Sequence, residues 1–225
     1  MTDPTMSRRV ARDIEVVLFD VGGVLVHLSG IEVIVGWLGG ALTEEQLWRR
    51  WLQSEAVRRF ETGRVDAPTF ARELARELDL AIEPPRLLAA FEGWLIGPYP
   101  GALELIREIP QRYGRAVLSN SNALHWPRVI GEMGLGALFA SEHLFVSHLT
   151  GRIKPDAEAF EHVIEVFGCV PSQVLFLDDN QLNVEAASRA GLQAVQVRGP
   201  KEARRALEER GILTSTTHSE AQSPR

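Results

Sequence analysis

The stretch Glu-Val-Val-Leu-Phe-Asp-Val-Gly-Gly-Val-Leu-Val-His, residues 15–27, decides the fold. It opens with an unbroken apolar run at 16–19 and then reaches one carboxylate, Asp20, and two glycines. A continuous apolar run, rather than an alternating one, is typical of a parallel strand covered by helices on both faces. Ligands of open parallel sheets bind where such strands end. Gly22 and Gly23 permit a tight turn and a close approach to a ligand, so the pattern predicts Asp20 at the mouth of a crevice.

Three further polar stretches follow candidate strands. Ser119 and Asn120 come after one apolar run, Lys154 after a second, and Asp178 and Asp179 directly after a third. Each stretch alone has an ordinary explanation, because these residue types are common in turns. Strands that alternate with helices form a parallel sheet, and ligands bind where such strands end. Together, these stretches therefore predict one site at one edge of a doubly wound α/β sheet.

The acid pair Asp178 and Asp179 points to a metal ion. Adjacent carboxylates at a buried strand end repel each other, and this repulsion is costly unless a cation lies beside them. A hard ion with oxygen ligands is the physical expectation, and Mg²⁺ is the predicted cofactor. Capping of the following helix accounts for one of the two acids, but not easily for both.

These motifs, in order and in context, resemble the four motifs of the haloacid dehalogenase-like (HAD) hydrolase superfamily over about residues 14–198. The resemblance implies a Rossmann-like core with an inserted helical cap, and Asp20 as a nucleophile that forms an aspartyl-phosphate. It implies that Ser119 and Lys154 are also catalytic. The residues predicted to bind substrate are Gly22, Gly23, Ser119, Asn120 and Lys154, and the resemblance implies this role for Ser119. Those that it assigns to the metal are Asp20, Gly22 through its carbonyl, Asp178 and Asp179.

Gly22 departs from this family pattern. Phosphatases of the superfamily usually have a second aspartate here, which protonates the leaving group and then activates water. Such help is typically worth about 10²- to 10⁴-fold, so its loss leaves a slow phosphatase, one served by another residue such as His27, or a protein without turnover. A glycine here resembles the group that includes a glucose-1-phosphate phosphatase and the N-terminal phosphatase-like part of epoxide hydrolase. Residues 118–125 and 60–63 resemble the former as well.

Because it lacks this acid, the chain is also similar to the 2-haloacid dehalogenases. Those enzymes attack carbon with the same aspartate and release a halide, which needs no proton. Those enzymes lack a metal and do not keep two acids at the last motif, whereas Asp178 and Asp179 are both present. The favoured prediction is a phosphohydrolase for a small phosphorylated metabolite, such as a sugar phosphate. A non-catalytic binder of phosphorylated metabolites comes second and a dehalogenase third.

The chain divides into an interrupted core and an insertion. We assign 14–28 and 99–212 to the core, 29–98 to a helical cap, 1–13 to a flexible N-terminus and 213–225 to a disordered tail. The insertion has helical patterns and no convincing strand: a capping box at Thr43 and Gln46 starts a helix that runs out near Gly63, and a helix after Pro84 continues through Leu95. Its tryptophans lie at helical apolar positions, which favours cap core over sugar-stacking platforms.

Composition limits the partners. The 225 residues are 45% hydrophobic, with a formal net charge of −6 and a pI near 5.6, which argues against a nucleic-acid surface. No run approaches the roughly 20 apolar residues of a membrane span, and no signal-peptide pattern follows the N-terminal arginines. The single cysteine, Cys169, forms no internal disulfide, so we expect a cytoplasmic protein. The sequence does not indicate an oligomeric state.

Overall fold

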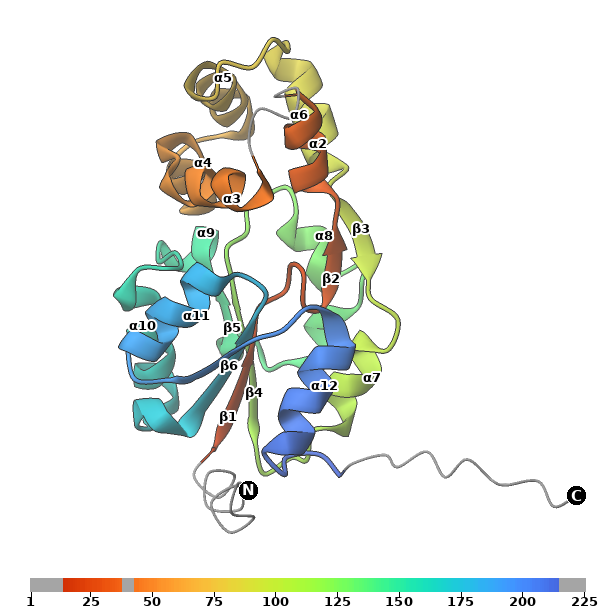
Figure 1. Cartoon of the computed structure of the whole chain (residues 1–225), viewed down its shortest axis with the longest axis vertical. Coiled ribbons are helices and arrows are strands. Elements are labelled where there is room, and N and C mark those ends of the chain that lie inside the picture. Colours follow the sequence, from red (N-terminus) through yellow and green to blue (C-terminus); the bar gives the residue numbers. More distant parts are fainter. Residues whose placement is uncertain (1–13, 38–42, 215–225) are drawn as a thin grey trace, which may run out of the picture.

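The strand at the centre of the fold is β1 (Val16–Phe19), in a computed structural model that describes residues 14–37 and 43–214. It lies in the middle of a five-stranded parallel sheet with the order β5-β4-β1-β6-β7. The other strands are β4 (Gly114–Ser119), β5 (Leu144–Val146), β6 (Val174–Asp178) and β7 (Gln193–Gln196). All four residues of β1 are buried. The predicted doubly wound parallel sheet is confirmed (Figure 1).

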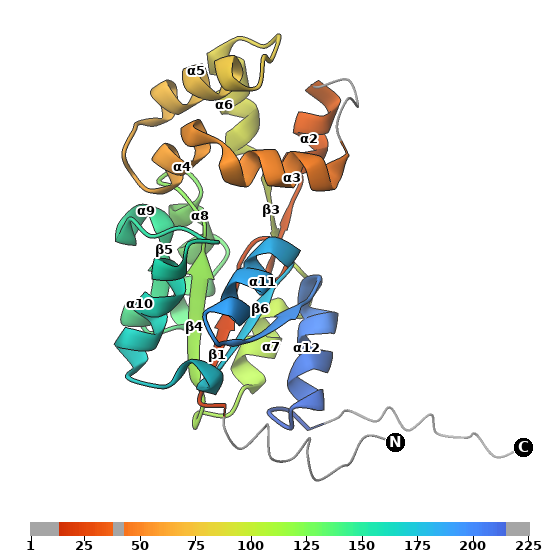
Figure 2. The same ribbon diagram turned by 60° about the vertical axis from the view of Figure 1, so that its left-hand side comes forward.

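Helices cover both faces of this sheet, so alternate residues of β1 enter different cores. Val17 and Phe19 belong to one hydrophobic cluster, and Val16 and Leu18 to another. The first cluster includes residues of α7 (Ala102–Glu108), α8 (Trp126–Ile130) and α12 (Gly199–Glu209). The second includes residues of α10 (Ala157–Phe167) and α11 (Gln181–Arg189). Figure 2 shows α7 and α12 side by side on one face of the sheet.

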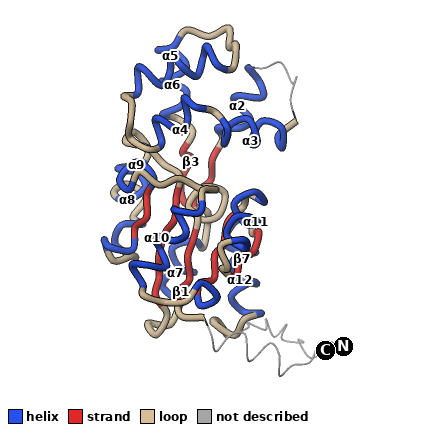
Figure 3. The backbone as a smooth tube through the Cα atoms, turned by 90° about the vertical axis from the view of Figure 1, so that its left-hand side faces the viewer, coloured by secondary structure: helices blue, strands red, loops and turns tan. Residues whose placement is uncertain are grey.

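Among the described residues, five helices between β2 and β3 form a separate body at one end of the molecule (Figure 1, Figure 3). They are α2 (Gly30–Trp37), α3 (Glu44–Gln53), α4 (Glu55–Glu61), α5 (Ala67–Glu77) and α6 (Pro84–Glu92). Their buried side chains make their own hydrophobic cluster, in which Phe70 stacks on Phe60 with ring centroids 4.4 Å apart and contacts Phe91 at 5.0 Å. We call this body the cap.

The capping box predicted for α3 is confirmed, because Thr43 accepts a hydrogen bond from the Gln46 amide and the Gln46 side chain accepts one from the Thr43 amide. The prediction that this helix continues to Gly63 is wrong. Ser54 ends α3 and also caps α4, since its hydroxyl accepts a hydrogen bond from the amide of Val57. The chain therefore turns at Ser54, and α4 runs in its own direction.

The prediction that residues 29–98 contain no strand is also wrong. β3 (Leu95–Pro98) pairs antiparallel with β2 (Val26–Leu28), and this ribbon connects the cap to the core. The helix before it ends at Glu92 rather than continuing through Leu95. Gly97 has a φ of +151°, which a helix does not accommodate. The pairing of β3 with β2 depends on a contact between distant residues, which a single sequence does not reveal.

The remaining short elements in residues 14–37 and 43–214 are α9 (Ser147–Thr150) and three 3₁₀ turns, Leu135–Leu138, Ser141–His143 and Pro171–Gln173. At the C-terminal end, Leu213 is buried in the core although it was assigned to the tail. The other predictions for the two ends, at 1–13 and 215–225, lie outside the described residues. Within the described part of the chain, no helix has the length and apolar character needed to span a bilayer.

Candidate active site

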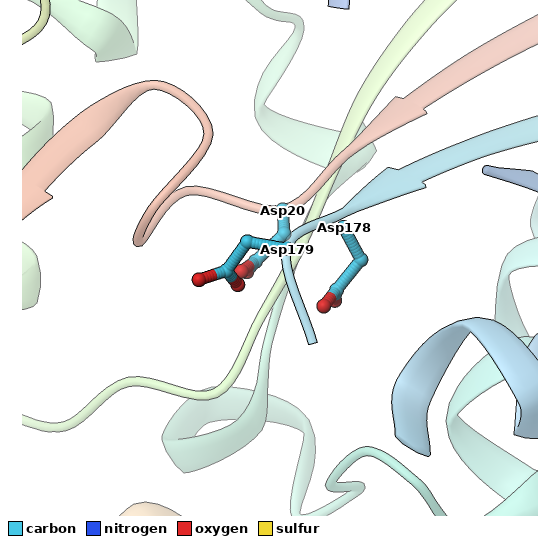
Figure 4. A group of neighbouring side chains, drawn as sticks. All are labelled: Asp20, Asp178 and Asp179. Atoms are coloured by element: carbon cyan, nitrogen blue, oxygen red, sulfur yellow. The ribbon is translucent and has the colours of Figure 1, made fainter. Parts of the chain in front are cut away.

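The predicted site residues come together at the carboxyl edge of the sheet. Asp20 follows β1, Ser119 is the last residue of β4 and Asp178 the last of β6. Lys154 lies in the loop between α9 and α10. These four side chains and Asp179 are brought into one region because three neighbouring parallel strands end there. Figure 4 shows the three aspartates projecting from the ends of β1 and β6.

Lys154 is the electrostatic centre of the site. Its ammonium group is buried and contacts Asp20 Oδ1 at 2.8 Å and Asp178 Oδ2 at 2.7 Å. Burial alone would lower the pKa of Lys154, but the two carboxylates raise it above its ordinary value. The lysine therefore keeps its proton, and its fixed positive charge lies directly beside Asp20.

Asn120 positions this lysine. Its side-chain amide donates to the carbonyl of Lys154 and its side-chain carbonyl accepts from the amide of Lys154, both at 2.9 Å. The Asn120 side chain therefore binds the backbone of Lys154, whereas the sequence predicted that Asn120 binds substrate. Ser119 and Asn120 both line the cavity beside Lys154.

Asp178 is fully buried and already occupied by hydrogen-bond donors. Besides Lys154, the amide of Asn180 donates to Oδ1 at 2.8 Å, and Asn183 Nδ2 lies 3.1 Å from both carboxylate oxygens. A buried carboxylate with this set of partners is held in one orientation. Because Asp178 is fixed in this way, its contact with the Lys154 ammonium group fixes the lysine side chain as well.

Asp179 points toward the turn that follows β1. A Cβ atom placed on Gly23, which has a φ of +70°, would lie 2.1 Å from Asp179 Oδ2, so only glycine fits there. Burial, together with the neighbouring charges of Asp20 and Asp178, raises the pKa of Asp179 to about 8. The pKa of Asp20 is raised to about 6 by burial, against the opposing effect of Lys154.

This donor set fits a magnesium ion. Asp20, Asp178 and Asp179 each offer a carboxylate oxygen, and these oxygens lie within 4.8 Å of one another. Burial is the main cause of the raised pKa values of Asp20 and Asp179, and a divalent cation beside these carboxylates would favour their ionised forms. Asn183 adds a buried Oδ1 atom without a hydrogen-bond partner among the described residues. Oxygen-only donors are those that Mg²⁺ prefers.

A cavity of about 330 Å³ opens over these groups, between the core and the cap. Gly22 and Gly23 line it from the core, together with Asp20, Lys154 and Asp179. Cap residues line it from the other side, among them Trp51, Glu61 and Trp94. The two tryptophans are buried in the cap cluster, as the sequence predicted, but they also face the cavity.

Sequence reasoning assigned no role to Glu61 or His125. Glu61 is buried at the end of α4. His125 is buried too, and its Nε2 lies 2.8 Å from the carbonyl of Phe91 in the cap while its Nδ1 lies 3.3 Å from Asn122 Nδ2. Burial lowers the pKa of His125 to about 4, so the neutral ring joins core to cap. Both lie in stretches that carry the family resemblance, 60–63 and 118–125, and Glu61 also lies four residues after Val57 on the apolar face of the helix.

Comparison with known proteins agrees with this geometry. A family model for haloacid dehalogenase-like hydrolases matches residues 14–191. The chain belongs to this family. D-ribitol-5-phosphate phosphatase of Bacteroides thetaiotaomicron is 25% identical over 187 residues, which cover 80% of this HAD-like chain and 90% of that protein.

Two solved structures show that this HAD-like chain shares its fold with known hydrolases. A HAD-family enzyme from Bacteroides thetaiotaomicron, in complex with magnesium and inorganic phosphate, has a TM-score of 0.62 and 23% identity, covering 82% of this chain and 94% of that one. L-2-haloacid dehalogenase from Xanthobacter autotrophicus, with chloropropionic acid covalently bound, has a TM-score of 0.56 and 24% identity, covering 82% and 77%. Because one fold can carry different functions, the function of this chain has to be argued from its site.

Proposed function

We propose that this HAD-like hydrolase is a magnesium-dependent phosphohydrolase that attacks a small phosphorylated metabolite with Asp20 and forms an aspartyl-phosphate. The observation that carries the proposal is the buried Lys154 ammonium, held between Asp20 and Asp178 beside a third carboxylate. A phosphoryl group brings negative charge to the nucleophile, so its attack requires fixed positive charge at the reacting oxygens.

The residues of the chain divide this work. Asp20 is the nucleophile, and Lys154 lowers its pKa against the effect of burial, so that a carboxylate is available to attack. Lys154 and Ser119 line the cavity where the phosphoryl oxygens would bind. Asp178 binds the ammonium group of Lys154, and Asn120 binds the backbone of the same residue. Asn183 in turn holds Asp178.

We assign the metal to Asp20, Asp179 and the carbonyl of Gly22, with Asp178 in support because its carboxylate is hydrogen-bonded to Lys154 and Asn183. When bound there, Mg²⁺ supplies positive charge to the phosphoryl oxygens. Its second effect is on the chain itself, because it favours the ionised forms of Asp20 and Asp179.

The cavity supports a small substrate. Its volume of about 330 Å³ suits a metabolite rather than a polymer, and cap side chains cover the end opposite the acids. The curated relative whose name specifies D-ribitol 5-phosphate supports a sugar or polyol phosphate. The acid pair Asp178 and Asp179 favours phosphate chemistry over the metal-free dehalogenase alternative.

A second candidate function is binding without turnover, and Gly22 is the observation that favours it. No side chain at position 22 can protonate a leaving group. A protein of this kind would bind phosphorylated metabolites and magnesium in the same cavity and release no phosphate.

The experiment is a phosphate-release assay over sugar phosphates, polyol phosphates, phospho-acids and nucleotides, with magnesium and with EDTA. We expect magnesium-dependent turnover by the parent protein and none by Asp20→Asn. Asp79→Asn is the matched control, because it makes the same change at an exposed cap residue with a φ of 52°, which asparagine tolerates well. Turnover that survives Asp20→Asn would refute the mechanism, while tight binding without turnover by the parent would favour the binder.

A further inference from the structure

A phosphatase with Gly22 needs a proton donor from elsewhere, and few groups that line the cavity can supply one. Lys154 is held by two carboxylates, which raise its pKa and retain its proton. His125 is neutral, with Nε2 turned to the carbonyl of Phe91. His27, the substitute considered from the sequence, is exposed and stacks on Tyr99 at 5.2 Å. Asp20 is the nucleophile and Asp179 is assigned to the metal, so Glu61 is the remaining carboxyl group among the described residues that line the cavity.

Glu61 is aimed into the cavity by a tight junction between cap and core. It is the last residue of α4, where the amide of Gly63 donates to the carbonyl of Phe60 and the Thr62 hydroxyl donates to the carbonyl of Arg58. Gly63 has a φ of +72°, and a Cβ atom there would lie 2.8 Å from the carbonyl oxygen of His148 in α9. The end of α4 therefore lies directly against the core, and only glycine permits this approach.

An ion pair fixes the same junction from the solvent side. Arg58, one turn before Glu61, pairs with Asp156 at the start of α10. Glu61 itself is 7% exposed and lines the cavity together with Asp20, Lys154 and Gly22. A carboxyl group from the cap thus faces the nucleophile and the lysine of the core across the space where a substrate would bind.

The surroundings keep this carboxyl group protonated. Burial raises the pKa of Glu61 to about 8. Lys154, a hydrogen bond from the Trp51 side chain and Arg58 act against this rise, and Asp20 adds to it. A carboxylic acid that keeps its proton at neutral pH and faces a reacting bond is the form that a general acid requires.

We propose that Glu61 is the catalytic proton donor to the leaving group in the phosphohydrolase reaction, and this inference rests on the function proposed above. An Asp20 oxygen attacks phosphorus, the bond to the leaving oxygen breaks, and that oxygen takes the proton of Glu61 and departs as an alcohol. Water then attacks the phosphorus of the aspartyl-phosphate while the Glu61 carboxylate accepts a proton from it. The bond to Asp20 breaks, so that inorganic phosphate, the Asp20 carboxylate and protonated Glu61 are formed.

Glu61→Gln tests this role with two substrates whose leaving groups differ in their need for a proton. An alkyl phosphate releases a strongly basic alkoxide, whereas an aryl phosphate with an acidic phenol releases a stable anion. We expect Glu61→Gln to lower kcat on the alkyl phosphate by about 10²- to 10⁴-fold and to change it little on the aryl phosphate. Glu55→Gln, at an exposed position of the same helix, is the control and should match the parent on both.

Equal losses on the two substrates would overturn the inference, because a merely structural residue affects every substrate alike. Retained alkyl phosphate activity would overturn it as well. Aryl phosphate turnover doubles as the test of folding. The infrared difference spectrum of parent minus Glu61→Gln at neutral pH should contain the C=O stretch of a protonated carboxyl group. Failure of the proposed function has a separate signature, namely aryl phosphate turnover that survives Asp20→Asn.

Discussion

The buried acid of Glu61 has a measurable consequence for stability. Its pKa rises from an ordinary value of 4.5 to about 8 in the folded protein. The folded state therefore holds a proton that the unfolded state has released at every pH between these two values. Stability falls as pH rises through this window, because the folded state binds more protons. Each pKa unit corresponds to about 1.4 kcal/mol, so the whole change is worth about 5 kcal/mol.

Glu61→Gln should remove this dependence. We expect the variant to gain stability relative to the parent as pH rises from 5 to 9, by about 4 kcal/mol, because about three pKa units lie between pH 5 and the folded-state pKa of about 8. The assay is urea unfolding of both proteins in EDTA across this range. Asp20, Asp179 and His125 are present in both proteins, so their titrations cancel in the difference. Glu55→Gln should run parallel to the parent. A Glu61→Gln curve that is also parallel to the parent would refute the buried, protonated acid.

Three further predictions concern the core side of the site. Asp179→Asn should weaken magnesium binding, measured by calorimetry, by about tenfold or more, which is about 1.4 kcal/mol. The magnesium affinity of the parent should rise as pH passes through the raised pKa values of Asp20 and Asp179. Equal magnesium affinities of parent and variant would remove Asp179 from the metal site. Lys154→Met should cost about 3–5 kcal/mol in urea unfolding, because two buried carboxylates lose their partner, and a loss below 1 kcal/mol would contradict the buried pairing. Gly22→Asp in the Glu61→Gln background should restore part of the turnover rate on the alkyl phosphate. Gly22 lacks a positive φ, and a Cβ atom there would meet only the flexible end of the Leu28 side chain. No gain in rate would mean that a side chain at this position does not reach the leaving oxygen.

The core could be predicted because its determinants are local. The apolar run of β1 specifies a buried strand, and its single carboxylate specifies where the strand ends. The same holds for β6 and the acid pair after it. Parallel strands then place their carboxyl ends together, so sequence position alone brings Asp20 and Asp178 to one edge.

What the sequence did not supply are the partners of each side chain. The amide of Asn120 could bind a phosphate or a backbone, and only the fold shows that the Lys154 backbone faces it. The β2–β3 ribbon escaped prediction because its two strands are far apart in the sequence and pair through an irregular register. Which of Asp178 and Asp179 pairs with the lysine, and which is left for the metal, depends on which carboxylate Lys154 contacts in the fold.

Glu61 shows why this limit matters for chemistry. At helical spacing it follows Val57 on the buried face of α4, so the sequence marks a carboxyl group that enters a core. Whether that core is inert or reactive depends on the approach of Gly63 to α9, a contact between residues far apart in the chain. In the proposed reaction, the phosphoryl group would bind at the sheet edge and its leaving group would lie under the cap. If the proton comes from Glu61, the body that selects the leaving group also protonates it, and a substrate that fails to fit the cap cavity fails to receive the proton.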